Sequence, residues 1–257
     1  MGPGGVKPRT VIIAQARMSS TRLPGKTLMD LGGAPVIDRV IARARRARLA
    51  DDVWVAITED ASDDVLEEHL RVVGAPYVRG SLDDVLARYV QAVEAASADV
   101  IVRITCDCPL IDPGVIDAVI GTFRADPGLD YCSNTLVRTY PIGMDTEVFA
   151  RHALERAHER ATEPHEREHV TPYLHQHPDH FRLENVAAPE WAVWPELRLT
   201  VDEAADLEML RGVVERVGPD AGLREVLELL RAEPSLAKIN AEVEHRHLET
   251  PVEHRGA

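Results

Sequence analysis

The chain has 257 residues, of which 45% are hydrophobic and 4% aromatic, and its formal net charge is −14. This length and apolar content suffice for one substantial core, so a single α/β domain is the default expectation. The acidic charge disfavours a general nucleic-acid binder and a protein that docks on anionic membranes. We expect no membrane span and no secretion signal, because no stretch of the sequence is long and apolar enough for either.

The three cysteines are too few for a disulfide framework. Cys106 and Cys108 are separated by one residue, which is not the spacing of a zinc or redox pair, and Cys132 stands alone. A reducing cytoplasm is the expected location.

The first apolar run is followed by a polar, cationic loop. Residues 11–14 are apolar and largely β-branched, which predicts a buried strand. Backbone flexibility at Gly25 lets main-chain N–H groups approach a ligand, and neighbouring cations can neutralise phosphate oxygens. The loop therefore predicts a nucleoside triphosphate site, since a merely solvated basic turn explains its composition poorly. The cations and hydroxyls are Arg17, Ser19, Ser20, Thr21, Arg22 and Lys26.

Two standard phosphate-binding loops do not fit this segment. Gly25, Lys26 and Thr27 match the end of the P-loop pattern G-x-x-x-x-G-K-[ST], but Ser20 stands where the first glycine is required. The dinucleotide fingerprint G-x-G-x-x-G does not follow the strand. The segment is therefore a third kind of phosphate-binding loop.

Ala16-Arg17 and the run from Ser20 to Lys26 resemble the signature of the sugar-acid cytidylyltransferase family, which includes the acylneuraminate and KDO cytidylyltransferases. The resemblance is closest to the spore-coat polysaccharide biosynthesis branch and covers residues 10–245. It implies a nucleotidyltransferase fold, with a doubly wound, mostly parallel sheet in a three-layer α/β/α arrangement. It also implies a small excursion after the fourth strand.

Strand-like and helix-like apolar spacing alternates through the first half of the chain. Repeated units of this kind predict a parallel sheet that binds ligands at the carboxyl ends of its strands, where the phosphate loop lies. After the first strand we expect helix 35–47, strand 53–57, helix 60–73, strand 76–78, helix 80–96, strand 100–104 and helix 113–124.

The expected organisation is one nucleotidyltransferase domain over residues 10–245, between a flexible tail over 1–9 and a polar tail over 246–257. Residues 130–200 form the excursion, in which the regular alternation lapses. We identify no internal repeat and no low-complexity linker.

An aspartate follows the fourth strand directly. Asp107 lies at the same sheet edge as the phosphate loop, where a carboxylate can hold a divalent cation that bridges triphosphate oxygens. Helix capping is the alternative, but Asp112 before Pro113 fits that role better. The resemblance places Asp107 at the family's magnesium-binding aspartate, although Cys106 replaces the glycine that often precedes it.

The excursion is expected to begin with a strand at 131–134, followed by a turn that leads into another strand near Glu147. The resemblance implies that it forms the sugar pocket and part of a dimer contact. The implied substrate contacts are Asn134, Arg138, Asp145, Glu147 and His169. Periodicity alone does not show this, because ordinary polar turn residues produce the same pattern.

Residues 165–169 match H-E-x-x-H, a motif in which two histidines bind zinc and the glutamate acts as a base. Pro164 abuts the motif and its intervening residues are charged, both of which disfavour a buried catalytic helix. The spore-coat branch has a run similar to Glu166–Tyr173, so a substrate-site or helix-start role for His169 is favoured.

A second aspartate follows an apolar strand near the C-terminus. Strands are expected at 181–186 and 197–201, and Asp202 follows the latter. Asp202 could cap the helix that follows, but the resemblance matches it to the family's second metal-binding aspartate. Two further amphipathic helices are expected at 223–230 and 235–243.

These features together predict an enzyme that transfers CMP from CTP to a sugar acid and releases pyrophosphate, with Mg²⁺ as cofactor. Arg17 and Lys26 are assigned to the phosphates with support from Arg22, and Asp107 and Asp202 to the metal. The expected nucleotide contacts are Ala14, Ala16, Arg17, Ser20, Thr21, Arg22, Lys26, Arg79 and Ser81.

The acceptor is left open by the sequence. A phosphonate acceptor, a guanylyl instead of a cytidylyl transfer, and a non-catalytic nucleotide-binding partner are the alternatives. We expect a cytoplasmic homodimer that binds CTP and a small acceptor and has no nucleic-acid or membrane partner.

Overall fold

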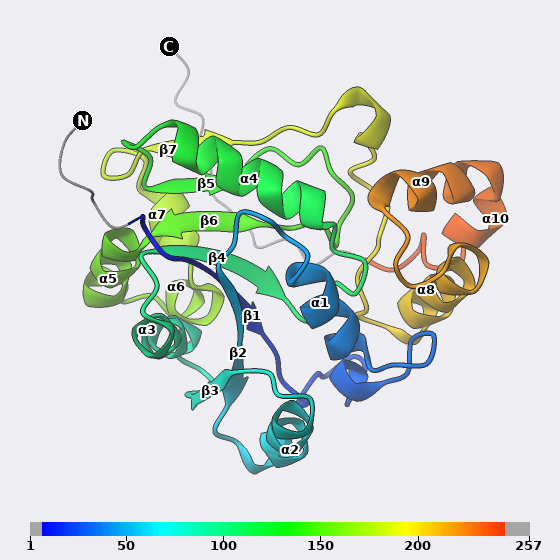
Figure 1. The fold of residues 1–257 in the computed structure, drawn as a ribbon, viewed down its shortest axis with the longest axis horizontal. Coiled ribbons are helices and arrows are strands. Elements are labelled where there is room, and N and C mark those ends of the chain that lie inside the picture. Colours follow the sequence, from blue (N-terminus) through cyan, green and yellow to red (C-terminus); the bar gives the residue numbers. More distant parts are fainter. Residues whose placement is uncertain (1–6, 245–257) are drawn as a thin grey trace.

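The computed structural model describes residues 7–244, in which seven strands form one sheet in the order β3-β2-β1-β4-β6-β5-β7 (Figure 1). The strands are β1 (Thr10–Gln15), β2 (Asp52–Thr58), β3 (Tyr77–Gly80), β4 (Val100–Thr105), β5 (Tyr131–Ser133), β6 (Glu147–Ala150) and β7 (Leu183–Asn185). β1 to β4 are parallel, and β6 runs antiparallel to both β4 and β5. The predicted mostly parallel, doubly wound sheet is therefore confirmed.

The helices follow the strands in the expected alternation and continue through the excursion. The helices longer than one 3₁₀ turn are α1 (Val36–Ala44), α2 (Asp64–Val72), α3 (Val85–Ala96), α4 (Pro113–Ala125), α5 (Arg151–Arg160), α6 (Pro164–His169), α7 (Pro172–Gln176), α8 (Ala204–Val217), α9 (Leu223–Ala232) and α10 (Pro234–Ala237). None of the helices within residues 7–244 is both long and apolar enough to cross a bilayer.

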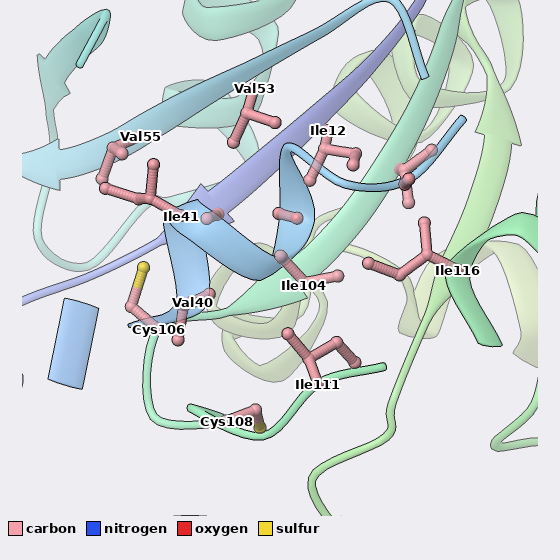
Figure 2. Close-up of a cluster of buried hydrophobic side chains, with 14 of the residues drawn as sticks. Ile12, Val40, Ile41, Val53, Val55, Ile104, Cys106, Cys108, Ile111 and Ile116 are labelled. Atoms are coloured by element: carbon pink, nitrogen blue, oxygen red, sulfur yellow. The ribbon is translucent and has the colours of Figure 1, made fainter. Parts of the chain in front are cut away.

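The two faces of β1 explain its continuous apolar run. Ile12 and Ala14 face a cluster that includes side chains of α1, α2 and α4, whereas Val11 and Ile13 face one that includes side chains of α3, α5 and α7. Successive side chains of a strand point to opposite faces, so a strand between two helical layers must be apolar at every position. Figure 2 shows the first cluster around Ile12.

A third apolar cluster joins the C-terminal helices to the sheet. α8, α9 and α10 gather beyond α1, on the side of the molecule away from α5 (Figure 1). Their apolar faces pack with Leu31, Val36, Leu110 and Val115, which lie at or shortly before the starts of α1 and α4. This cluster holds the segment before α8 against the carboxyl end of the sheet.

The expected strand at 197–201 is wrong. This segment forms one isolated bridge, between Ile142 and Arg198, and the Val201 N–H donates to the Asp107 carbonyl at 2.7 Å. The alternating apolar residues that suggested a strand, Leu197, Leu199 and Val201, are buried in the third cluster. The segment therefore pairs with loops and not with the sheet.

The helix expected at 235–243 is much shorter, because α10 ends at Ala237. The buried Asn240 follows in a turn, and its amide donates to the Arg198 carbonyl at 3.2 Å and to Asp206 at 2.8 Å. Of the expected tails, residues 1–6 and 246–257 lie outside the described residues. Arg9, within the expected N-terminal tail, donates from its side chain to Asp52 at 2.8 Å.

Asp206, at the start of α8, is fully buried and collects several hydrogen bonds. Arg198 donates to it from Nε at 3.1 Å, and the backbone N–H groups of Asp202 and Glu203 donate at 2.9 and 3.0 Å. Burial alone raises the pKa of Asp206, but the hydrogen bonds, led by those from Arg198 and Asn240, hold it below the ordinary value. The carboxylate thus fixes the turn that precedes α8.

We expect Asp206→Asn to lower the free energy of unfolding by about 3 kcal/mol at neutral pH, because the buried Arg198 loses one of its two carboxylate partners and keeps only Asp202. Since the native pKa of Asp206 is depressed, its stabilisation is present above the ordinary aspartate pKa and disappears as pH falls through the native value. Urea unfolding from pH 7 to pH 3 measures this difference. The exposed pair Arg46–Asp220 supplies a control, Asp220→Asn, with an expected effect under about 0.5 kcal/mol. An equal loss in both variants would contradict the assignment.

Candidate functional site

A cavity of about 330 Å³ opens at the carboxyl ends of β1 and β4. These two strands are adjacent at the centre of the sheet (Figure 1). Residues from the loop after β1, the ends of β1 and β4, α3, α6 and the segment before α8 line it. They are Gln15, Ala16, Arg17, Ser20, Thr21, Arg22, Lys26, Thr27, Val85, Arg88, Thr105, Cys106, Asp107, Glu168, His169 and Asp202. The structure thus brings both predicted aspartates and the predicted phosphate loop to one cavity.

The loop after β1 is held in a tight fold by its own backbone. Gly25 adopts φ 74°, and its N–H donates to the Met18 carbonyl, as does the N–H of Ser20. A positive φ of this kind favours glycine, which explains the Pro24-Gly25 pair. The hydroxyl of Thr27 donates to the Arg17 carbonyl at 2.9 Å, so both ends of the loop are tied together.

The start of this loop is anchored by Asp63. This buried carboxylate accepts from the Met18 N–H at 2.7 Å and from both the N–H and the hydroxyl of Thr58 at 2.8 and 2.6 Å. Sequence analysis placed Asp63 only within the expected helix 60–73. Its role in joining the loop to the end of β2 depends on a tertiary contact that no local pattern reveals.

Lys26 lies between the two predicted metal-binding aspartates. Its ammonium is 2.9 Å from Asp107 and 3.0 Å from Asp202, and it also donates to the Val201 carbonyl at 2.6 Å. Side-chain exposure is 12% for Lys26, 27% for Asp107 and 14% for Asp202, so these charges are largely screened from water. One cation therefore joins three segments that are far apart in the sequence.

The charges of this cluster shift the pKa values of Lys26 and Asp107. Burial lowers the pKa of Lys26, but the attraction of Asp107 and Asp202 outweighs it and raises the pKa overall. Burial raises the pKa of Asp107, and Lys26 together with the Thr105 hydroxyl at 2.5 Å lowers it below the ordinary value. Asp107 is therefore a carboxylate, and Lys26 an ammonium, at neutral pH.

Asp202 is shared among three cations. Besides Lys26, Arg22 contacts Asp202 at 2.8 Å and Arg198 contacts it at 3.0 Å. The capping box at the start of α8 is formed by Glu203 and Asp206. The competing interpretation of Asp202 as a helix cap is therefore not needed to explain that helix end.

Asp107 and Asp202 fit a hard divalent cation that also binds substrate. Both present carboxylate oxygens to one point, the position of the Lys26 ammonium. Within residues 7–244, no group of three or more His, Cys, Asp or Glu side chains is placed to hold a metal. Magnesium commonly takes only one or two carboxylates and completes its coordination with water and phosphate oxygens, so two aspartates beside a phosphate loop suit it.

Cys106 lines the cavity but lacks the character of a nucleophile. Burial, followed by the nearby Asp107, raises the pKa of its thiol, and burial also raises the pKa of the Cys108 thiol. A thiolate is the reactive form of cysteine, so both side chains are inert at neutral pH. All three cysteines are buried and free.

The motif at 165–169 forms the short helix α6, and its glutamate serves that helix. Glu166 is buried and accepts from the N–H groups of Thr162 and Glu163, both at 3.2 Å, as half of a capping box. His165 contacts Gln176 at 3.1 Å, whereas His169 lines the cavity. A glutamate engaged by the helix start cannot act as the base of a zinc protease.

A strained turn follows His169. Val170 is buried and adopts φ 73° and ψ −54°, and the Thr171 N–H donates to the His169 carbonyl at 2.9 Å. A γ-turn with positive φ is rare, and a β-branched residue in it is strained. The Thr171 hydroxyl donates to the buried Glu147 at 2.6 Å, which ties the turn to β6. Backbone strain of this kind often marks functional sites, and here the turn directly follows Glu168 and His169, which line the cavity.

The remaining predicted site residues lie outside the cavity lining. Arg79 pairs with Asp64 at 2.8 Å, and Arg138 pairs with Asp145 through two hydrogen bonds of 2.6 and 2.7 Å. Their assignment to ligand binding stays a prediction. The full set outside the lining is Ala14, Arg79, Ser81, Asn134, Arg138, Asp145 and Glu147.

Glu147 and Asn134 are engaged within the fold. Glu147 accepts from Tyr131 at 2.6 Å and pairs with Arg103, and the Asn134 side chain bonds the backbone of Met144 and Thr146 at 2.7 and 2.9 Å. These contacts position the strands and turn of the excursion.

Several lining residues were missed by sequence reasoning. A helical signal was available for Val85 and Arg88, which lie one turn apart on α3 after its N-cap Asp84. The others depend on tertiary placement. The missed residues are Gln15, Thr27, Val85, Arg88, Thr105, Cys106 and Glu168.

Comparison with known proteins gives concordant matches. Residues 11–210 match the family model described as cytidylyltransferase. The chain is 36% identical over 234 residues to the spore coat polysaccharide biosynthesis protein SpsF of Bacillus subtilis, covering 88% of this chain and 96% of that protein. It is 38% identical over 150 residues to 3-deoxy-manno-octulosonate cytidylyltransferase of Chlorobaculum parvum, covering 58% of this chain and 56% of that enzyme.

A solved structure is similar over nearly the whole chain. A cytidylyltransferase from Leptospira borgpetersenii superposes with a TM-score of 0.85 at 30% identity, covering 93% of this chain and 100% of that one. The three-layer nucleotidyltransferase fold predicted from the sequence is thus confirmed.

We expect Lys26→Met to lower the free energy of unfolding by about 2 kcal/mol at pH 7, because Asp107 and Asp202 then face each other without the ammonium. The depressed native pKa of Asp107 means that this contribution is present above the ordinary aspartate pKa and is lost as pH falls through the native value. Urea unfolding of both proteins between pH 7 and pH 3 should show converging stabilities.

Lys7→Met is the matched control, because Lys7 pairs with Asp51 at the surface with 66% of its side chain exposed. A difference between the wild type and Lys26→Met that stays constant down to pH 3 would contradict the role assigned to the Lys26–Asp107 pair.

Proposed function

The chain belongs to the cytidylyltransferase family, and from this membership we propose that it transfers CMP from CTP to a sugar acid and releases pyrophosphate. The similarity to a spore coat polysaccharide biosynthesis protein and to a 3-deoxy-manno-octulosonate cytidylyltransferase supports this acceptor class. The observation that carries the proposal is the Lys26–Asp107–Asp202 cluster beside a phosphate-binding loop.

In the proposed reaction, an oxygen of the acceptor attacks the α-phosphorus of CTP. The new O–P bond forms as the bond from the α-phosphorus to the bridging oxygen breaks, and pyrophosphate leaves with that electron pair. The acceptor hydroxyl releases its proton to solvent. Arg17, Arg22 and Lys26 are proposed to neutralise the triphosphate and the leaving group. No covalent enzyme intermediate is required, which accords with the inert thiol of Cys106.

Asp107 and Asp202 are the proposed magnesium ligands. The bound ion would supply charge neutralisation and lower the pKa of the acceptor hydroxyl. Lys26 is proposed to exchange its carboxylate partners for phosphate oxygens when nucleotide and metal are present. Its four-carbon stem permits this exchange, because a flexible lysine side chain can direct its ammonium to different acceptors.

We propose a cytoplasmic homodimer that uses CTP and a small acceptor, without nucleic-acid or membrane partners. Three free, buried cysteines support a reducing compartment, and the net charge of −14 gives no support to nucleic-acid binding.

The reaction is tested by pyrophosphate release with Mg²⁺, offering each of the four nucleoside triphosphates against a panel of sugar acids and phosphonates. We expect release with CTP and a sugar acid. A response restricted to GTP or to a phosphonate would replace the proposed substrates. Nucleotide binding without release for any pair would favour a non-catalytic partner, and absence of nucleotide binding would refute the proposal.

Asp107→Asn and Lys26→Ala should each lower turnover at least about 100-fold while circular dichroism shows an unchanged fold. Lys26→Ala removes a cation proposed to stabilise the transition state, and Asp107→Asn removes a carboxylate proposed to hold the metal. Asp220→Asn and Lys7→Ala make the same changes at exposed surface pairs and should retain wild-type turnover. Near-normal pyrophosphate release from Asp107→Asn would argue against the site.

Removal of divalent cations by EDTA should abolish release, and Mg²⁺ should restore it, because the two aspartates need a cation to bind triphosphate oxygens. The control is calorimetric titration of Mg²⁺ into Asp107→Asn in the presence of CTP, in which the metal affinity should fall. Full activity in EDTA would refute the metal assignment.

A further inference from the structure

Arg88 is a buried arginine in the wall of the active-site cavity. Arg88 is only 3% exposed, yet it lines the cavity together with Val85, which lies one turn earlier on α3. Its Nη1 donates to the Ser81 carbonyl at 3.0 Å. Its Nε is buried and has no hydrogen-bond partner among the described residues.

Arg43 shows what a buried structural arginine looks like in the same protein. It is 2% exposed, and its Nε, Nη1 and Nη2 donate to the carbonyls of Ile111, Pro219 and Ala221 at 2.8, 3.0 and 2.9 Å. Arg88 has one such bond, and within residues 7–244 it forms no ion pair with a carboxylate. A buried cation left with unused donors is unfavourable unless something else satisfies them.

The fold holds Arg88 in place despite this deficit. A Cβ on Gly80, at the end of β3, would come within 3.0 Å of the Arg88 Cγ and within 2.5 Å of the Gln91 Oε1, so the stem packs directly over a glycine. Burial is the main cause that lowers the pKa of Arg88. Tyr89 and Asp63 offset part of this effect and Arg17 adds to it, although guanidinium stays charged at neutral pH. The group is therefore a fixed fork of donors beside the cavity.

We propose that Arg88 binds two adjacent, coplanar hydrogen-bond acceptors of a substrate in this cavity. This inference rests on the proposed function and names a residue that determines specificity. Two substrate groups present such acceptors: the O2–N3 edge of cytosine and the carboxylate of a sugar acid. Ala16 and Val85 give apolar surface to the same cavity, which suits a flat base, so the cytosine edge is the expected one. Uracil presents an N3–H donor at that edge and would be discriminated against.

The test compares Arg88→Met and Arg88→Lys with the wild type by calorimetric binding of CTP and UTP. For the cytosine edge, Arg88→Met should weaken CTP binding by about 10- to 100-fold and UTP binding much less, so the preference for CTP collapses. Arg88→Lys keeps the charge but loses the fork and should lose most of the same preference. No turnover is needed, so this result is distinguishable from failure of the proposed transfer reaction.

A carboxylate ligand gives a different pattern. Nucleotide binding is then unchanged in Arg88→Met. The KM for the sugar acid that supports pyrophosphate release rises at least about 10-fold, whereas the KM for the amide analogue of that acid does not rise. Unchanged affinities and unchanged KM in a folded Arg88→Met would overturn the proposal. An equal loss for CTP, UTP and inorganic triphosphate would also overturn it, because it indicates a general charge effect.

Stability of the ligand-free protein separates a ligand-binding from a structural arginine. Arg43→Met removes three satisfied hydrogen bonds and should lower Tm clearly, whereas Arg88→Met removes a poorly satisfied charge and should leave Tm nearly unchanged. If Arg88→Met lowers Tm as much as Arg43→Met, the role of Arg88 is structural and the proposal fails.

Discussion

The proposed active site of this protein depends on the attraction between one ammonium and two carboxylates. Lys26 comes from the loop after β1, Asp107 from the end of β4, and Asp202 from the segment before α8. Each group alone would be destabilised by burial, and together they stabilise one another. The parallel β1–β4 pair brings the first two together, because both strands end at the same edge of the sheet. The third requires the C-terminal helices to pack back onto that edge.

That packing is supported by a second charge cluster behind the first. Arg198 contacts both Asp202 and Asp206, and Asn240 donates to Asp206, so the turn that carries Asp202 is fixed by buried polar groups. The third apolar cluster provides the surrounding core. Specific placement of Asp202 thus comes from hydrogen bonds, and its approach to the sheet comes from burial of α8 and α9.

The sequence predicted most of the parallel sheet, because a strand buried on both faces has a continuous apolar run and helices follow it at a regular period. It failed at residues 197–201, where alternating Leu197, Leu199 and Val201 are buried by helices and not by a neighbouring strand. Alternating apolar residues indicate that one side of an extended segment is buried. They do not identify the element that buries it. The short helices of the excursion were missed because they show too little pattern. α6, for example, has too few residues to display a helical period.

The site was predictable where chemistry and strand ends coincide, as at Asp107 and the phosphate loop. The site was not predictable from the sequence where the role of a side chain depends on whether the fold satisfies its hydrogen bonds. Arg43, Arg88 and Arg198 are all buried arginines, and their sequence contexts give no sign of how they differ. Arg43 is satisfied by carbonyls and Arg198 by carboxylates, whereas Arg88 has a buried donor without a partner in the described chain. The unsatisfied donor of Arg88 lies beside the cavity and supports the proposed contact with a substrate, and only the three-dimensional inventory of hydrogen bonds identifies it.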